Sequence, residues 1–305
     1  MDLSLLQQLC KIKGVSGDES RVKAFVLSYV ERHSHKWAVT PEVIQGNEIQ
    51  DALLLVFGKP TLAVFSHMDT VGYTVGYGSG LIKIGGPSAV SDCVLVGEDS
   101  VSEIECRLNI DNDGTLSYLY HRDIDRGTCL SYKENFIQSD SYIQSPYLDN
   151  RLGMFAALTQ AETMENGVLA FSCYEETGGG NTEVLARILY NKYQISQALI
   201  CDITWVTSGV QHGNGVAISM RDSGIPRKSF LNRVIEIATE SGVHFQLEVE
   251  SSGGSDGNAL QKSPYPFDWC FIGAAEDNVH SPEEKVAIKD IEDMVDLYQV
   301  LLQRL

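Results

Sequence analysis

The residues best suited to chemistry are two histidines and several carboxylates that follow predicted strands. They are His67 and Asp69 after Thr61–Phe65, Glu175 and Glu176 after Val168–Tyr174, Asp202 at the end of Ala198–Asp202, and His280 beyond Phe267–Ile272, with Asp149 at the start of a predicted helix. In an open α/β sheet the carboxyl ends of the strands carry the functional groups. Burying this many carboxylates together costs about several kcal/mol unless cations neutralise them. The sequence therefore predicts a metal site at one edge of a sheet.

The mixture of imidazole and carboxylate groups favours zinc, cobalt or manganese over calcium, which prefers oxygen ligands alone. His67 and Asp69 are two positions apart, so an extended chain places them on the same side. Asp69 could therefore bind a metal directly or orient the His67 ring. Glu175 and Glu176 are adjacent and should diverge, which suits one metal ligand and one proton carrier.

The elements that must position these groups form an α/β pattern. After Asp149, strands alternate with amphipathic helices, which predicts a mixed, mostly parallel sheet with helices on both faces. Residues 73–145 differ, because short alternating runs separated by Gly and Asp-Gly turns predict an inserted, small all-β, barrel-like domain. Residues 1–72 plus 146–305 would then form the main domain.

Two local predictions concern the N-terminal part of the main domain. Ser16–Glu19 has the Ser-x-x-Glu form of a capping box and should open an amphipathic helix. The apolar runs Ala52–Phe57 and Thr61–Phe65 flank Gly58–Pro60, which predicts two strands joined by a tight turn.

Composition excludes several classes of partner. The chain has 41 Asp and Glu against 23 Lys and Arg, a formal charge of −18, which argues against binding a nucleic-acid backbone. No apolar stretch reaches the roughly 18 to 20 residues that span a bilayer, so no membrane association is expected. The seven cysteines are dispersed without metal-binding spacing, which favours reduced thiols. These features together predict a cytoplasmic protein.

Six ordered segments of the chain resemble the motifs of the dinuclear metallo-aminopeptidases of the glutamyl/deblocking aminopeptidase family, some of which carry the name endoglucanase. The segments are His67–Gly72, Tyr147–Gly153, Glu175–Gly178, Cys201–Thr204, Gly253–Gly257 and His280–Glu283. The resemblance implies a zinc-peptidase-like fold and two divalent ions per subunit, zinc or cobalt, with manganese as a further candidate. It also implies removal of N-terminal residues from short peptides, and a homo-oligomer such as a hollow dodecamer.

The same resemblance implies a role for each candidate residue. The metal ligands would be His67 and Asp202 for one ion, Glu176 and His280 for the other, and Asp149 for both. Asp69 would orient His67. Glu175 would act as general base and acid, which agrees with the two roles expected of the adjacent glutamates.

Two segments depart from the family pattern, Gly178–Asn181 after the glutamate pair and Glu276–Val279 before the last histidine. Both leave the ligand set intact, so they bear on substrate preference and assembly. Glu276 and Asp277 beside the site would favour substrates with a basic N-terminal residue, unless both point to solvent.

Two alternatives to an aminopeptidase remain open from the sequence. The related dinuclear carboxypeptidases and deacylases use a similar ligand set with a differently built second domain. A non-catalytic metal-binding scaffold is the other, although structural zinc sites are usually closed by Cys and His rather than carboxylates.

Overall fold

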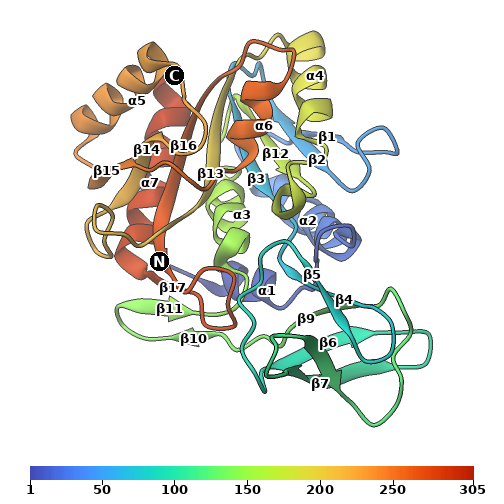
Figure 1. The fold of residues 1–305 in the computed structure, drawn as a ribbon. Coiled ribbons are helices and arrows are strands. Elements are labelled where there is room, and N and C mark those ends of the chain that lie inside the picture. The colour runs from blue at the N-terminus through green and yellow to red at the C-terminus, as the bar shows by residue number, and fades with distance from the viewer.

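A computed structural model describes all 305 residues, which form a large mixed sheet flanked by helices and a smaller antiparallel sheet at one end (Figure 1). The helices are α1 (Ser4–Cys10), α2 (Ser20–His33), α3 (Leu148–Gln160), α4 (Thr182–Tyr193), α5 (Lys228–Ser241), α6 (Asp256–Lys262) and α7 (Ile288–Arg304), with short 3-10 helices η1 (Ser34–Lys36) and η2 (Glu175–Thr177). The larger sheet contains β1 (Glu42–Ile44), β2 (Leu53–Phe57), β3 (Ala63–His67), β10 (Ile137–Gln138), β11 (Tyr142–Gln144), β12 (Gly167–Ser172), β13 (Gln197–Trp205), β14 (Val216–Arg221), β15 (Phe245–Val249), β16 (Asp268–Asp277) and β17 (Lys285–Ala287).

The larger sheet confirms the predicted α/β class. Its strands run in the order β1-β2-β12-β3-β13-β16-β17-β11-β10, and β14 pairs with β16 and β15. The central strands β12, β3, β13 and β16 are parallel, whereas the outer pairs are mainly antiparallel. The strands around Gly58–Pro60 are not neighbours, because the fully buried β12 lies between β2 and β3. The turn therefore links two strands that pair with a third.

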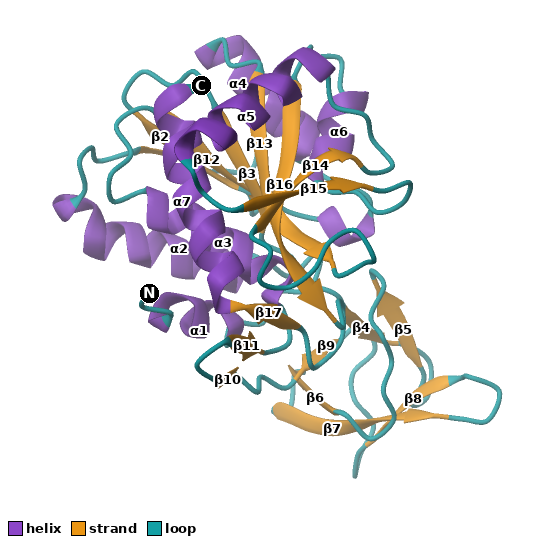
Figure 2. Cartoon of the chain, turned by 90° about the vertical axis from the view of Figure 1, so that its left-hand side faces the viewer, coloured by secondary structure: helices purple, strands orange, loops and turns teal.

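Helices cover both faces of this sheet, as two consecutive residues of β13 demonstrate. The Cys201 thiol donates to the Gly153 carbonyl of α3 at 3.4 Å, whereas Asp202 accepts a hydrogen bond from Ser255 at the start of α6 at 2.6 Å. Since successive strand residues point to opposite faces, α3 and α6 lie on opposite sides of the sheet. Figure 2 shows the layered arrangement from the side.

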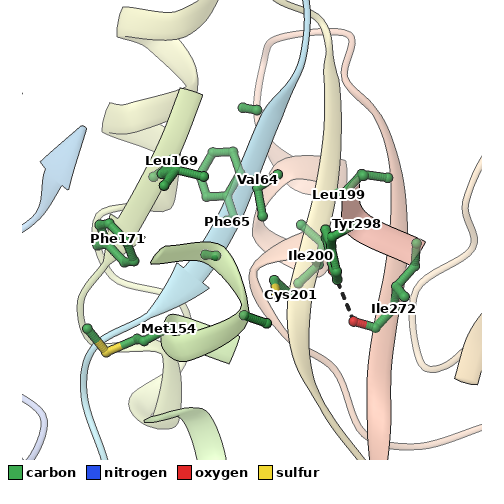
Figure 3. Packing of buried hydrophobic residues seen from close by; sticks show 14 of the residues in the cluster. Val64, Phe65, Met154, Leu169, Phe171, Leu199, Ile200, Cys201, Ile272 and Tyr298 are labelled. Atoms are coloured by element: carbon green, nitrogen blue, oxygen red, sulfur yellow. Dashed lines mark hydrogen bonds between the residues drawn. The ribbon is translucent and has the colours of Figure 1, made fainter. Parts of the chain in front are cut away.

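The core lies between the sheet and the helices on both of its faces, and Figure 3 shows a part of it that includes side chains of α3 and α7. Phe65, Leu169 and Ile200 come from three neighbouring central strands and are fully buried. Such continuous apolar runs are typical of parallel strands covered on both faces. The Tyr298 hydroxyl of α7 donates to the Ile272 carbonyl at 3.0 Å, which satisfies a buried polar group and fixes the helix on β16.

Gly153 allows α3 to approach β13 closely. A Cβ atom at this position would lie 2.1 Å from the Cys201 carbonyl oxygen and 2.2 Å from Asn150 Oδ1. We expect Gly153→Ala to lower the free energy of unfolding by about 1–3 kcal/mol, because neither neighbour is the free end of a flexible chain. Urea unfolding measures this, with Gly209→Ala as the control, since no atom lies closer than 3.8 Å to that position. Equal stability of the two variants would contradict the close approach.

The smaller sheet contains β4 (Gly72–Val75), β5 (Leu81–Ile84), β6 (Val94–Glu98), β7 (Glu103–Ile110), β8 (Leu116–Leu119) and β9 (Cys129–Tyr132). Its order is β5-β4-β9-β6-β7-β8 and every pair is antiparallel. A cluster of 13 buried residues forms a core of its own, separate from that of the larger sheet. The nearby β11 pairs with β17 in the larger sheet instead, and β10 pairs with β11 at its edge. None of the helices is long and apolar enough to cross a membrane.

Candidate metal centre

The five predicted metal ligands meet at the carboxyl ends of the central strands. His67 is the last residue of β3, Glu176 lies in η2 just after β12, His280 follows β16, and Asp149 lies in the first turn of α3. Asp202 lies within β13 rather than at its end, which corrects the predicted strand boundary. The reason is that β16 continues alongside it, so that β13 remains paired as far as Trp205.

Asp149 connects two groups of ligand atoms. Its Oδ1 lies 3.2 Å from His67 Nε2, which is also 3.5 Å from Asp202 Oδ2. Its Oδ2 lies 3.2 Å from His280 Nε2, which is also 3.1 Å from Glu176 Oε2. Within each group of three residues the ligand atoms all lie within 4.8 Å of one another. Two adjacent groups of candidate ligands therefore share one carboxylate, that of Asp149.

Without a cation, the protons of the two histidines balance the carboxylates. Burial by itself lowers the pKa of His67, but Asp202 and Asp149 outweigh it and raise that pKa well above its usual value. Burial and the charge of Asp149 raise the pKa of Glu176 to about 7, although His280 opposes this. Metal ions bind neutral imidazole and ionised carboxylate, so they would take the place of these protons.

The residues present fit divalent metal ions. Asp149 Oδ1 and Glu176 Oε1 are buried and receive no hydrogen bond. Buried polar atoms are otherwise almost always paired, so two free carboxylate oxygens in one site fit the binding of a cation. The set of two imidazoles and three carboxylates matches zinc, cobalt and manganese chemistry.

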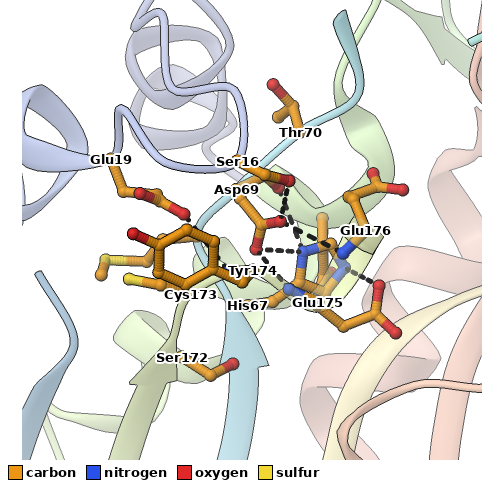
Figure 4. A network of polar contacts seen from close by, with 12 residues as sticks. Ser16, Glu19, His67, Asp69, Thr70, Ser172, Cys173, Tyr174, Glu175 and Glu176 are labelled. Atoms are coloured by element: carbon orange, nitrogen blue, oxygen red, sulfur yellow. Dashed lines mark hydrogen bonds and ion pairs between the residues drawn. The ribbon is translucent and has the colours of Figure 1, made fainter. Parts of the chain in front are cut away.

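Asp69 contacts both the His67 ring and the η2 backbone (Figure 4). Its Oδ1 lies 3.5 Å from His67 Nδ1 and accepts a hydrogen bond from the Glu175 amide at 3.0 Å, while its Oδ2 accepts one from the Glu176 amide at 3.1 Å. Asp69 is fully buried and does not belong to either ligand group. Of the two roles open from the sequence, this geometry favours orienting His67 over binding a metal.

Ser16 contacts this network, whereas the sequence predicts it to cap a helix. The capping-box prediction is wrong: α2 begins at Ser20, and no side chain caps it. The Ser16 hydroxyl instead donates to Asp69 Oδ2 at 2.6 Å. Only the tertiary fold brings Ser16 to Asp69, so the local motif could not reveal this contact.

Glu19 supports the backbone just before the glutamate pair. Its side chain is 1% exposed and accepts a hydrogen bond from the Tyr174 amide at 3.2 Å. Burial is the main cause that raises the pKa of Glu19 from 4.5 to about 7. The folded state therefore favours the protonated acid, and this group's stabilising contribution is lost as pH rises from 4.5 through 7.

We expect Glu19→Gln to stabilise the protein by about 1 kcal/mol or more at pH 8, because glutamine keeps the acceptor oxygen without the buried charge. At pH 4.5 the variant and the wild type should unfold at nearly the same denaturant concentration. Urea unfolding at both pH values tests this. A variant that is less stable at pH 8 would show that the charge of Glu19 is favourable.

Two further polar residues contact the ligands from outside the two groups. Ser255 donates to Asp202, and Glu284 Oε2 accepts a hydrogen bond from the Asp149 amide at 3.1 Å. Glu276 is 1% exposed, and both its oxygens lack hydrogen bonds. Burial and then the nearby Glu284 raise the pKa of Glu276 well above its usual value. Nothing in the sequence distinguishes Glu284 from other glutamates of the chain.

The acidic residues of the Glu276–Val279 segment do not face the cavity at the centre. Neither Glu276 nor Asp277 belongs to its lining. Asp277 instead lies 3.0 Å from His212 Nε2. The prediction that these two carboxylates contact the substrate is therefore wrong, because one is buried beneath the site and the other is paired elsewhere.

Comparison with known proteins identifies the family. The model of the M42 glutamyl aminopeptidase family matches residues 117–297, more than half of the chain. The chain belongs to the M42 glutamyl aminopeptidase family. As a member of this family it is a metal-dependent aminopeptidase, and the suspected resemblance is confirmed.

Individual relatives include an aminopeptidase over nearly the whole chain and a desuccinylase over half of it. One relative is a protein of Acetivibrio thermocellus to which aminopeptidase activity is ascribed. It is 22% identical to this chain over 96% of both chains. The succinyl-diaminopimelate desuccinylase of Xylella fastidiosa (strain M23) is 28% identical over 50% of this chain and 44% of its own. The TET1 peptidase of Pyrococcus horikoshii has the same fold, with a TM-score of 0.82 and 19% identity over 99% of both chains. The M42 aminopeptidase fold thus extends over the whole chain.

Proposed function

We propose that this M42 aminopeptidase holds two divalent ions and removes N-terminal residues from short peptides. His67, Asp149 and Asp202 would hold one ion, and Asp149, Glu176 and His280 the other. The observation that carries the proposal is the position of Asp149, whose two oxygens face different histidines at 3.2 Å each. Zinc or cobalt suits this donor set best, and manganese is the third candidate.

Bound there, the two ions would polarise the scissile carbonyl and lower the pKa of a water molecule. The chain's own residues then handle the proton. Glu175 Oε2 lies 3.9 Å from His67 Nε2 and the side chain lines the cavity. Glu175 takes the proton from the attacking water and delivers it to the leaving amine.

Asp69 acts through His67 rather than on the substrate. The Asp69 backbone carbonyl lies at hydrogen-bond distance from His67 Nδ1, 3.1 Å, and its carboxylate lies 3.5 Å from the same atom. The carboxylate also accepts hydrogen bonds from two backbone amides, which fixes η2 with Glu175 and Glu176. One buried residue therefore sets the positions of a ligand, a second ligand and the proton carrier. Such outer contacts typically change metal affinity or activity by about 10- to 100-fold.

The test is incubation of the purified protein with cobalt and a mixed library of short peptides, followed by mass analysis of the products. Loss of residues from the N-terminus supports the proposal. Loss of C-terminal residues or acyl groups would favour the related carboxypeptidase and deacylase chemistry. No change in any peptide would favour a non-catalytic metal-binding scaffold.

We also infer that this chain forms a homo-oligomer and that each subunit contains an inserted domain. The TET1 peptidase of Pyrococcus horikoshii can assemble into a tetrahedron or a large octahedral shell. A dodecamer of this chain is the corresponding proposal, with residues 73–145 as the inserted domain and residues 1–72 plus 146–305 as the catalytic one, although β10 and β11 at the end of the inserted range join the larger sheet. All seven cysteines are free, which is compatible with the proposed cytoplasmic location. Light scattering of the purified protein in solution gives the mass of the assembly and hence the number of subunits.

A further inference from the structure

A cavity of about 280 Å³ opens beside the proposed metal centre. Its lining includes the five proposed ligands and Glu175, so it is continuous with the reaction site. Away from the ligands, Asp222, Glu248 and Glu250 line the cavity, and we name these three residues the acidic wall. The lining contains no lysine or arginine. The acidic wall therefore faces the cavity without a balancing cation.

Within the acidic wall, Glu248 on β15 gives the strongest indication that the cavity binds a positively charged group. Its side chain is 4% exposed, and its Oε1 accepts a hydrogen bond from the Thr204 hydroxyl. Its Oε2 receives no hydrogen bond from the chain. Thr204 is two residues beyond Asp202 on β13, so this contact joins the acidic wall to the metal centre. Since Oε2 is not one of the buried polar atoms that lack a partner, it is open to the cavity and can accept a charge-assisted hydrogen bond from a cation there.

Asp222 follows β14, which lies between β15 and β16 (Figure 2). It is 7% exposed, and the Gly224 amide donates to its Oδ1. Burial and then the charge of Glu248 raise the pKa of Asp222. The nearby Arg221 points its guanidinium at the Asp222 backbone carbonyl, at 3.2 Å, and makes no ion pair with the carboxylate. The charge of Glu248 therefore disfavours the ionised form of Asp222, and a positive charge in the cavity would favour it.

We propose that the acidic wall binds the positively charged side chain of a substrate whose N-terminal residue is Lys or Arg. This inference rests on the proposed function, because the cavity would be the pocket for the residue that is released. Trp205 lines the same cavity and is 44% exposed, so its ring offers a face to an aliphatic stem or a cation. A glutamate side chain would be repelled, in contrast to the glutamyl preference for which the family is named.

Three aminoacyl-coumarin amides test the proposal, with Lys, norleucine and Glu as the N-terminal residue. Lysine and norleucine share an unbranched stem and differ chiefly in the charge. We expect kcat/KM for Lys to exceed that for norleucine by at least about tenfold, because charge-assisted hydrogen bonds form only with Lys. Norleucine cleaved as fast as Lys would overturn this inference alone. No cleavage of any amide would overturn the proposed function, and this inference with it.

The variants Glu248→Gln and Asp222→Asn locate the binding group. Each should lower kcat/KM for Lys by at least about tenfold and leave norleucine within about twofold. Retained norleucine activity also shows that the variants fold. If the acidic wall instead binds the peptide's terminal ammonium, both substrates should lose activity equally, which would overturn the proposal. Glu236→Gln on the exposed side of α5 is the control for loss of one negative charge.

Discussion

Glu175→Gln should lower kcat by about 10²- to 10⁴-fold while both metal ions remain bound. The reason is that Glu175 lies beside His67 without belonging to either ligand group, so its loss removes the proton carrier only. Glutamine has nearly the same size and cannot accept a proton from water. Steady-state kinetics with a leucine or lysine amide, together with the metal content by mass spectrometry, provides the measurement.

The matched control is Glu236→Gln, which removes an exposed carboxylate from α5 and should leave kcat unchanged. Burial is the main cause that raises the pKa of Glu175 well above its usual value, with Asp202 and Glu176 adding to it. Removing its charge should therefore not destabilise the fold. A Glu175→Gln variant with full activity would show that another group carries the proton. Loss of metal from the variant would show that Glu175 is itself a metal ligand.

Asp149→Asn should lose both metal ions, because Asp149 is the one residue shared by the two ligand groups. We expect two ions per subunit in the wild type and close to none in this variant. Loss of about 4 kcal/mol of transition-state stabilisation would lower the activity by about a thousandfold. Metal added at about 100 times its dissociation constant should stabilise the wild type by about 2.7 kcal/mol, whereas the unfolding temperature of the variant should not respond.

Variants of ligands that belong to only one of the two groups distinguish the loss of one ion from the loss of both. Asp202→Asn should weaken only the ion at His67, and Glu176→Gln only the ion at His280, so each should retain about one ion per subunit. This graded series distinguishes a shared bridging carboxylate from two independent sites. Retention of two ions by Asp149→Asn would disprove the bridge, and a single ion in the wild type would disprove the dinuclear centre.

Much of the site could be predicted because its residues follow strands. The apolar runs of β3 and β12 are legible from the sequence, and the polar residues that come directly after them must lie at the edge of the sheet. The order of the motifs around His67, Asp149 and His280 then indicates the family. The acidic composition argues against nucleic acid as a partner, because like charges repel. These inferences need only local pattern and the direction of the chain.

The contacts of single side chains depended on the tertiary structure. Ser16 donates to Asp69 rather than capping α2, and β12 lies between the two strands around Gly58–Pro60. The sequence pattern indicates Glu276 and Asp277 as the substrate-binding charges, whereas Glu248 and Asp222 line the cavity.

The physical reason is the same in each case. Whether a side chain is buried or paired depends on which distant segments pack together. The sequence alone cannot distinguish an acidic residue that is buried away from the cavity from one that lines it. Strand pattern therefore determined where the metal centre of this protein lies. Only the pairing of β14 with β16 and of β15 with β14 decided which charges a substrate would meet there.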